Sequence, residues 1–208
     1  MISDLMAFIQ YRLGAQVDAA GRALSETSWS GQLSGSENLW MLLEGAHVLT
    51  LMLFAGTILM VDLRLLGVAF RQTPVSKVTD TLLPYTVAGF ALMVTTGLLL
   101  FASNPLDYYH NFWFRLKFGF VLVAALNIFL FHRRVQVNRS TWDHLAKPPA
   151  GARAAAVVSL AMWTAIIVAG RFAAYDWFNC DRADGAVAAV SQCAARASAL
   201  AHISPEIL

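Results

Sequence analysis

The stretch LWMLLEGAHVLTLMLFAGTILMV, residues 39–61, decides the fold class of this chain. It is almost wholly apolar, and about 20 such residues are enough for one helix to cross a membrane. Three further stretches have the same character, and they cover residues 82–102, 112–131 and 154–174. A helix satisfies its own backbone hydrogen bonds in lipid, and no window alternates in polarity as a barrel strand does. The sequence therefore predicts an all-α integral membrane protein, built as a bundle of four transmembrane helices.

The composition supports this interpretation. Of the 208 residues, 58% are apolar and 13% are charged, and the mean hydropathy is +0.57. A soluble domain is about 45–50% apolar and about 25% charged, so the composition argues against a soluble enzyme and against a disordered chain. Two cysteines are too few for a disulfide-dense secreted scaffold, and the net charge of +2 does not indicate nucleic-acid binding. We expect the lipid bilayer as the partner of the chain and no nucleic acid.

The basic residues set the expected orientation, because lysine and arginine gather on the cytoplasmic side of a membrane. The segments between the first and second spans and between the third and fourth carry Arg64, Arg71, Lys77, Arg133, Arg134, Arg139, Lys147 and Arg153, whereas the outer segments carry only Arg12, Arg22, Arg182 and Arg196. This excess predicts a multi-pass protein of the bacterial inner membrane with both termini in the periplasm. Aromatic residues at the outer helix ends fit an interfacial belt, and these are Trp40, Tyr108, Tyr109, Trp113, Tyr175 and Trp177.

Three parts of the chain follow from this layout, covering residues 1–38, 39–177 and 178–208. The first is predicted as an amphipathic periplasmic helix followed by a Ser/Gly-rich connector, because apolar residues recur at helical spacing: Leu5, Phe8, Ile9, Leu13, Val17 and Ala20. The second is the membrane domain, in which Pro84 is expected to begin or kink the second helix. The third is a short periplasmic tail, with an Ala-rich surface helix expected over residues 186–201.

The tail holds both cysteines of the chain, Cys180 and Cys193. Disulfides persist in oxidising compartments such as the periplasm. We therefore expect these two residues to form a disulfide, with two independent thiols as the alternative.

Ionisable residues inside the apolar spans are costly and mark candidate functional sites. At about 1.5 Å of rise per residue, Glu44, His47, Arg115, Lys117 and Arg171 share one layer in the outer half of the membrane. Three of them also have a simpler interpretation. Arg115 could reach out to the interface, Glu44 could only neutralise Lys117, and a histidine in an apolar span is commonly a hydrogen-bonded core residue.

This layer is suited to a b-type haem, which needs an axial imidazole and cations for its two propionates. His47 would be the axial ligand, and Arg115, Lys117 and Arg171 would be the cations. His110, in the outer loop, is a candidate second ligand if it folds inward, whereas His132 lies roughly 20 Å further across the membrane. No C-x-x-C-H motif is present, so the haem would not be covalently attached.

Other signals are weaker. Thioether ligands can hold copper(I), but the methionines of the spans do not share one depth, and these are Met41, Met52, Met60 and Met93. Asp62, Arg64 and Asn127 lie near the inner helix ends, where they could pair as a structural clamp. No nucleophile–base pair, phosphate loop or zinc motif is present, so no catalytic residue is assigned.

The motifs AHVLTLMLFAGTILMVDLRLLG (46–67), RLKFGFVLVAALNIFLF (115–131) and AGRFAAY (169–175) resemble those of an uncharacterised family of small bacterial inner-membrane proteins with four helices. Its first-helix pattern is matched by His47, Gly56 and the D-L-R-L-L-G run at 62–67. More distantly, the histidine of the first helix and Lys117 of the third resemble two better-known groups. These are the membrane domain of the copper-resistance protein CopD and the haem-binding HemJ-type proteins.

The sequence thus predicts a haem b-binding redox protein, or a subunit of a redox complex, that transfers electrons between the quinol pool and the periplasm. A quinone and another membrane or periplasmic redox protein would be its partners. Two alternatives stay open. One is a non-enzymatic accessory or scaffold subunit, in which the buried layer only fixes helix packing, and the other is a CopD-like copper-handling protein.

Overall fold

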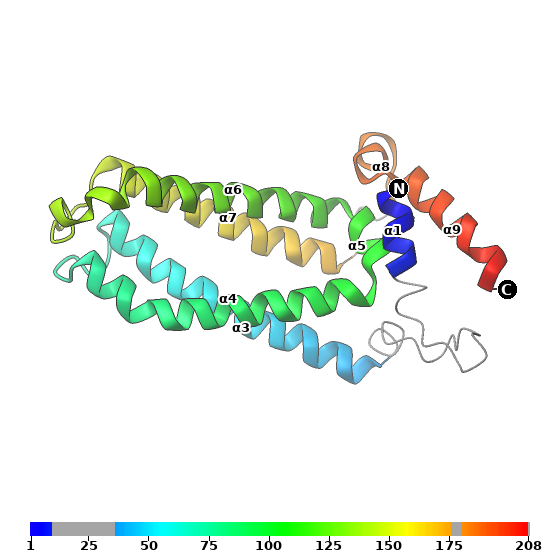
Figure 1. Ribbon diagram of the computed structural model, residues 1–208, viewed down its shortest axis with the longest axis horizontal. Coiled ribbons are helices and arrows are strands. Elements are labelled where there is room, and N and C mark those ends of the chain that lie inside the picture. The colour runs from blue at the N-terminus through cyan, green and yellow to red at the C-terminus, as the bar shows by residue number, and fades with distance from the viewer. Residues whose placement is uncertain (10–35, 176–179, 208) are drawn as a thin grey trace. The chain divides into compact units, whose positions relative to one another are not determined.

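The computed structural model describes residues 1–9, 36–175 and 180–207, and in these ranges every regular element is helical (Figure 1). Within these ranges, four helices are long and apolar enough to cross a membrane. They are α3 (Glu37–Leu66), α4 (Val75–Ser103), α6 (Phe112–Arg134) and α7 (Ala150–Ala174). The four predicted spans are therefore confirmed as helices of the required length and composition.

The helices α3 and α4 extend beyond the apolar stretches on which they were predicted. Only residues 67–74 connect them, and Gly67 ends α3 with a φ of 70°, a left-handed conformation that suits glycine. A Cβ atom at Gly67 would also lie 3.0 Å from the carbonyl oxygen of Ala146, so this turn packs closely against the segment before α7. Pro84 lies inside α4 and does not begin it, which corrects one of the two expectations for that residue.

The chain forms two compact units, each of which is described by itself. The first comprises residues 1–47, 95–116 and 169–208, and the second comprises residues 48–94 and 117–168. These units follow packing, whereas the predicted parts 1–38, 39–177 and 178–208 follow composition.

The second unit is a four-helix bundle with an apolar core. Phe54 of α3 packs edge-to-face on Trp163 of α7, with ring centroids 4.8 Å apart, and Ala124 and Ile166 complete the cluster. A Cβ atom on Gly89 of α4 would lie 3.1 Å from the backbone nitrogen of Phe54, so the small residue lets α3 and α4 approach closely. A second cluster lies near the turns and contains Leu65, Val75, Trp142, Ala152 and Ala156.

In its described residues the first unit contains four shorter helices, which are α1 (Ile2–Phe8), α5 (Pro105–His110), α8 (Gly185–Ser191) and α9 (Cys193–Ile207). Ala7, Leu106 and Ala199 form their shared core, so the N-terminal helix packs against the helices that follow the second and fourth spans. Two residues of the predicted amphipathic face, Leu5 and Phe8, are exposed. The rest of that predicted helix from Leu13 onward, and Trp177 of the aromatic belt, lie outside the described residues.

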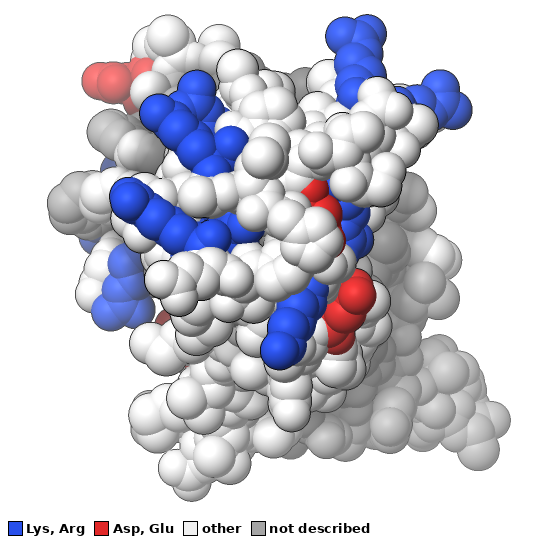
Figure 2. All heavy atoms as spheres, turned by 90° about the vertical axis from the view of Figure 1, so that its left-hand side faces the viewer, with Lys and Arg blue, Asp and Glu red and all other residues white. Residues whose placement is uncertain are grey.

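The long helices present an apolar surface. Many large apolar side chains on them are exposed, among them Leu42, Leu49, Leu98 and Leu122, and Leu49 is 68% exposed. So large an exposed apolar area is typical of a surface that contacts lipid. The face made by the α3–α4 turn and the segment between α6 and α7 differs, because Lys and Arg side chains gather there with few acids (Figure 2).

Candidate functional site

The imidazole of His47 is held between α3 and α4 within the first unit. Its Nδ1 atom lies 2.9 Å from Oγ1 of Thr96, so the two groups share a hydrogen bond. A Cβ atom at Gly97 would lie 3.1 Å from Cε1 of His47, which means that the ring rests against the bare backbone of α4 at this glycine. The ring is half-buried. Coordination of an iron atom would therefore use Nε2, because Nδ1 is engaged by the threonine.

Such a hydrogen bond is what a ligating histidine requires. A partner on one ring nitrogen fixes the tautomer and orientation of the ring and raises the basicity of the other nitrogen. A threonine hydroxyl can accept the Nδ1–H bond. The residues present at this position thus fit an axial ligand, and they equally fit a hydrogen-bonded core histidine. Thr96 and Gly97 were not predicted from the sequence, although the T-T-G run at 95–97 is a polar interruption of an otherwise apolar span.

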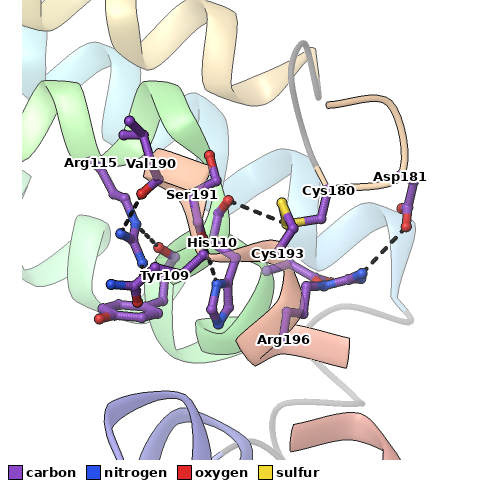
Figure 3. Close-up of a disulfide and its surroundings, with 11 residues drawn as sticks. Tyr109, His110, Arg115, Cys180, Asp181, Val190, Ser191, Cys193 and Arg196 are labelled. Atoms are coloured by element: carbon purple, nitrogen blue, oxygen red, sulfur yellow. Dashed lines mark hydrogen bonds and ion pairs between the residues drawn. A yellow bond between two sulfur atoms is a disulfide. The ribbon is translucent and has the colours of Figure 1, made fainter. Parts of the chain in front are cut away.

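Arg115 uses its guanidinium to hold the C-terminal tail (Figure 3). Its Nε atom donates to the carbonyl of Tyr109 at 2.7 Å, Nη1 donates to the carbonyl of Val190 at 2.7 Å, and Nη2 donates to the side chain of Gln192 at 3.2 Å. The guanidinium also stacks on the ring of Tyr109, 4.5 Å from its centroid. These contacts give Arg115 a structural role that depth along the helix alone does not reveal.

His110 binds the same tail segment and is only 1% exposed. Its Nδ1 atom lies 2.7 Å from the carbonyl oxygen of Ser191, so Nδ1 carries the proton and donates it. Burial lowers the pKa of His110 below its usual value, and the positive charges of Arg115 and Arg196 lower it further, although the bond to Ser191 opposes the shift. The imidazole is therefore kept neutral, and its hydrogen bond goes to Ser191 of the tail.

A disulfide joins Cys180 to Cys193 beside this histidine (Figure 3). The Sγ atom of Cys180 lies 3.8 Å from the carbonyl oxygen of His110. Nearby, Arg196 of α9 pairs with Asp107 of α5 at 2.7 Å and with Asp181 at 3.3 Å. The disulfide thus closes a loop within the tail, and ionic and hydrogen bonds fix the tail onto α5 and the start of α6.

The other candidate cofactor residues have few contacts. Arg171 is exposed, donates to the hydroxyl of Tyr175 at 2.6 Å, and stacks on the same ring. Within the described parts of the chain, the side chains of Glu44 and Lys117 have neither a hydrogen bond nor an ion pair. Of the candidate cofactor residues, only Lys117 belongs to the second unit. The first unit contains the others, which are Glu44, His47, His110, Arg115 and Arg171.

The residues considered for metal ions are not grouped. Among the described residues, no three His, Cys, Asp or Glu side chains are close enough to hold a metal ion. Three of the four methionines considered for copper, Met41, Met52 and Met60, are exposed on the outer surface of α3. His132 is also exposed and bonds to the carbonyl of Ile128 in its own helix.

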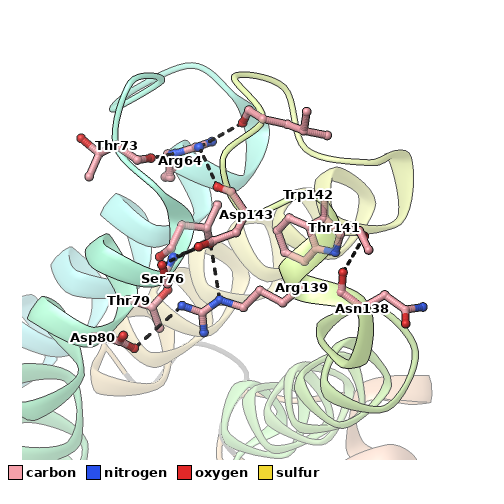
Figure 4. A network of polar contacts seen from close by, with 12 residues as sticks. Arg64, Thr73, Ser76, Thr79, Asp80, Asn138, Arg139, Thr141, Trp142 and Asp143 are labelled. Atoms are coloured by element: carbon pink, nitrogen blue, oxygen red, sulfur yellow. Dashed lines mark hydrogen bonds and ion pairs between the residues drawn. The ribbon is translucent and has the colours of Figure 1, made fainter.

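A second polar group lies in the second unit, at the turns (Figure 4). Arg64 is fully buried and donates to the carbonyls of Thr73 and Leu145, at 2.6 and 3.0 Å. Asn127 donates to the carbonyl of Ala155 at 2.9 Å, and Oδ2 of Asp62 is buried with no hydrogen-bond partner among the described residues. The expected clamp is thus corrected, since Arg64 and Asn127 fix different segments and Asp62, Arg64 and Asn127 do not pair with one another in the described part of the chain.

The chain belongs to a family of unknown function, DUF6644, whose sequence model matches residues 25–176. This agrees with the resemblance to an uncharacterised family that the first, third and fourth spans carry. No curated protein and no solved structure matches the chain. These comparisons provide no link to the CopD membrane domain or to HemJ-type proteins.

Proposed function

We propose that this family member is a membrane protein that binds b-type haem, with His47 as an axial ligand, and that it acts in electron transfer as a redox protein or as a subunit of a redox complex. The observation that carries the proposal is the hydrogen bond between His47 Nδ1 and Thr96, together with the packing of the ring on Gly97. Both features belong to α4, and together they orient the imidazole that α3 carries. Bound haem would supply one-electron chemistry.

The roles of the surrounding residues follow from their contacts. Thr96 would hold the tautomer of His47 that ligates through Nε2. Arg171 is exposed and lies in the same unit as His47, so it is the candidate cation for a propionate. The guanidinium of Arg115 instead donates its hydrogen bonds to Tyr109 and to the tail. Lys117 stays a candidate on its depth in the sequence, and His110 is the weaker candidate for a second ligand because it bonds to Ser191.

The membrane orientation is part of the proposal. The excess of Lys and Arg in the two inner segments supports a bacterial inner-membrane protein with both termini in the periplasm, and the disulfide of the tail supports the same side. Electrons would then pass between the quinol pool and a periplasmic partner. A reporter that is active only in the periplasm should work when fused after Leu208 and stay silent when inserted near Arg139, and the reverse pattern would overturn the orientation.

The haem is tested with matched variants. Haem content per mole of membrane-inserted protein should be lost in His47→Ala and kept in His132→Ala, because His132 is exposed and bonds to its own helix. Thr96→Val should lower haem retention about tenfold, as is typical when the partner of a ligating histidine is removed, whereas Thr95→Val should leave it unchanged. Equal haem content in His47→Ala and wild type would overturn the proposal.

A second candidate function is supported by the tail. Arg115, His110 and Arg196 fix α8 and α9 with hydrogen bonds and ion pairs, which is the behaviour expected of an accessory or scaffold subunit with a rigid docking surface. In that case the protein would purify without haem, and removal of residues 180–208 would release a partner subunit from the membrane complex. Loss of haem on His47→Ala would favour the first candidate.

A further inference from the structure

A hollow opens on the basic face of the second unit, next to the last residue of α3. It is lined by Leu66, Gly67, Val68, Arg71, Ala146 and Lys147. Two of these side chains are cationic and exposed, three are aliphatic, and none is acidic. The hollow therefore combines positive charge with apolar surface at the point where a membrane-spanning helix ends.

The walls of the hollow are held in place by hydrogen bonds to backbone carbonyls. The fully buried guanidinium of Arg64 connects the two turns, because it donates to the carbonyls of Thr73 and Leu145 (Figure 4). The close approach of Gly67 to Ala146 adds a second contact between the same turns. At the rim, Nε of Arg71 donates to the carbonyl of Gly67, which fixes the guanidinium over the opening.

The positive charge of this region is not cancelled by its acids. Asp143, the carboxylate of the adjoining turn, is engaged with Ser76 and Arg139. Nη1 of Arg64 is buried and has no hydrogen-bond partner among the described residues. Arg71 and Lys147 therefore present an unopposed charge to an anion.

The apolar residues decide which anion fits. Leu66 ends the span, Val68 is 62% exposed beside it, and Phe70 is exposed on the same turn. A small soluble anion would gain nothing from these side chains. A phospholipid would contact both surfaces, with its phosphate on the cations and its acyl chains on the aliphatic groups.

We propose that this hollow binds the headgroup of an anionic phospholipid, with Arg71 and Lys147 contacting the phosphate and with Leu66 and Val68 contacting the acyl chains. The geometry of the two turns, tied by Arg64, preorganises the cations for this contact. The site is independent of the proposed haem, because none of the residues that line it is among those proposed to hold the haem. Its role would be to anchor this end of the bundle in the leaflet where it lies.

The proposal is tested on the full chain in detergent, with binding of phosphatidylglycerol, phosphatidylcholine and inorganic phosphate measured by native mass spectrometry. The double variant Arg71→Gln/Lys147→Gln should bind phosphatidylglycerol about 30-fold more weakly, at about fivefold per cation near an anionic lipid. The matched control Lys77→Gln/Arg134→Gln removes the same charge from exposed residues outside the hollow, and it should change binding less than about threefold, since a Debye length of about 8 Å screens distant charges.

A third variant separates a lipid from a free anion. Val68→Asn should weaken binding of phosphatidylglycerol while leaving binding of inorganic phosphate unchanged, because only the lipid contacts the aliphatic wall. Equal weakening by the two double variants would overturn the proposal, since the attraction would then be general. Displacement of the bound lipid by millimolar inorganic phosphate would also overturn it, and would assign the hollow to a soluble anion.

Discussion

Replacement of Asp143 by alanine should loosen the start of α4. The Asp143 carboxylate reaches across the chain to the first turn of that helix, where it accepts a hydrogen bond from the backbone nitrogen of Ser76 at 2.7 Å and another from its hydroxyl at 2.5 Å (Figure 4). The carboxylate therefore serves as an N-terminal cap supplied from another segment. It also pairs with Arg139 at 3.5 Å.

The magnitude follows from the number of bonds lost. A hydrogen bond to a charged group contributes about 1.5–3 kcal/mol, and the side chain of Asp143 is only 13% exposed, so water replaces these bonds poorly. Two bonds at the lower end of that range give a loss of about 3 kcal/mol, which corresponds to about 150-fold in an opening equilibrium. Hydrogen exchange of the Ser76 amide, followed in detergent micelles by mass spectrometry, should accelerate by that factor.

A neighbouring carboxylate provides the control. Asp80 also faces Arg139, but at 3.9 Å and with a side chain that is 72% exposed. Exposed ion pairs contribute about 0–1 kcal/mol, so Asp80→Ala should leave exchange at Ser76 within about threefold of wild type. If both variants accelerate exchange equally, or if Asp143→Ala leaves it unchanged, the reasoning about the cap is refuted.

The same cap predicts a dependence on pH. Burial raises the pKa of Asp143, but the two bonds from Ser76 and the charge of Arg139 outweigh it, so the pKa lies below its usual value. The stabilisation is therefore complete above the unfolded pKa of about 3.9, and it is lost as the pH falls through the lower folded value. The protection factor of Ser76 should stay constant from about pH 5 to 7 and decline below about pH 4, and Asp143→Ala should abolish that decline.

Three further predictions concern the tail. Thiol-alkylation mass spectrometry of unreduced protein should label neither Cys180 nor Cys193, whereas labelling of both would show that the disulfide is absent from the cell. Arg115→Met removes three hydrogen bonds and should destabilise the docked tail by about 2 kcal/mol, seen as faster proteolytic removal of residues after Tyr175, and wild-type kinetics would contradict the contacts described. Burial under the docked tail lowers the pKa of His110, so the state in which the tail is undocked binds more protons just below about pH 6.5, and protection of the tail amides should fall on acidification through that value. The fall should vanish in His110→Gln, and a persistent pH dependence would assign it to another group.

The spans could be predicted from sequence and their ends could not. Apolar length alone identifies α3, α4, α6 and α7, since crossing the membrane requires only that property. The end of α3 depends instead on Gly67 packing against Ala146, and the start of α4 depends on a carboxylate 67 residues away. These contacts join segments that are distant in the sequence, so a hydropathy pattern cannot predict them.

The candidate site shows the same division. Depth along a helix correctly singles out His47 and Arg115 as polar residues in an apolar span. It does not reveal that the histidine bonds to Thr96, 49 residues further along the chain, or that the arginine bonds to the tail. A cation that bonds to a distant backbone carbonyl has the same sequence signature as a cation that binds a ligand.

The absorption spectrum of the wild-type protein, purified from haem-replete cells and recorded in oxidised and reduced forms, tests the central claim most directly. Haem coordinated by His47 predicts a Soret band and a reduced α-band that both disappear in His47→Ala while the variant still inserts into the membrane. A colourless wild-type protein would contradict the claim, and the hydrogen-bonded histidine would then be a structural contact between α3 and α4.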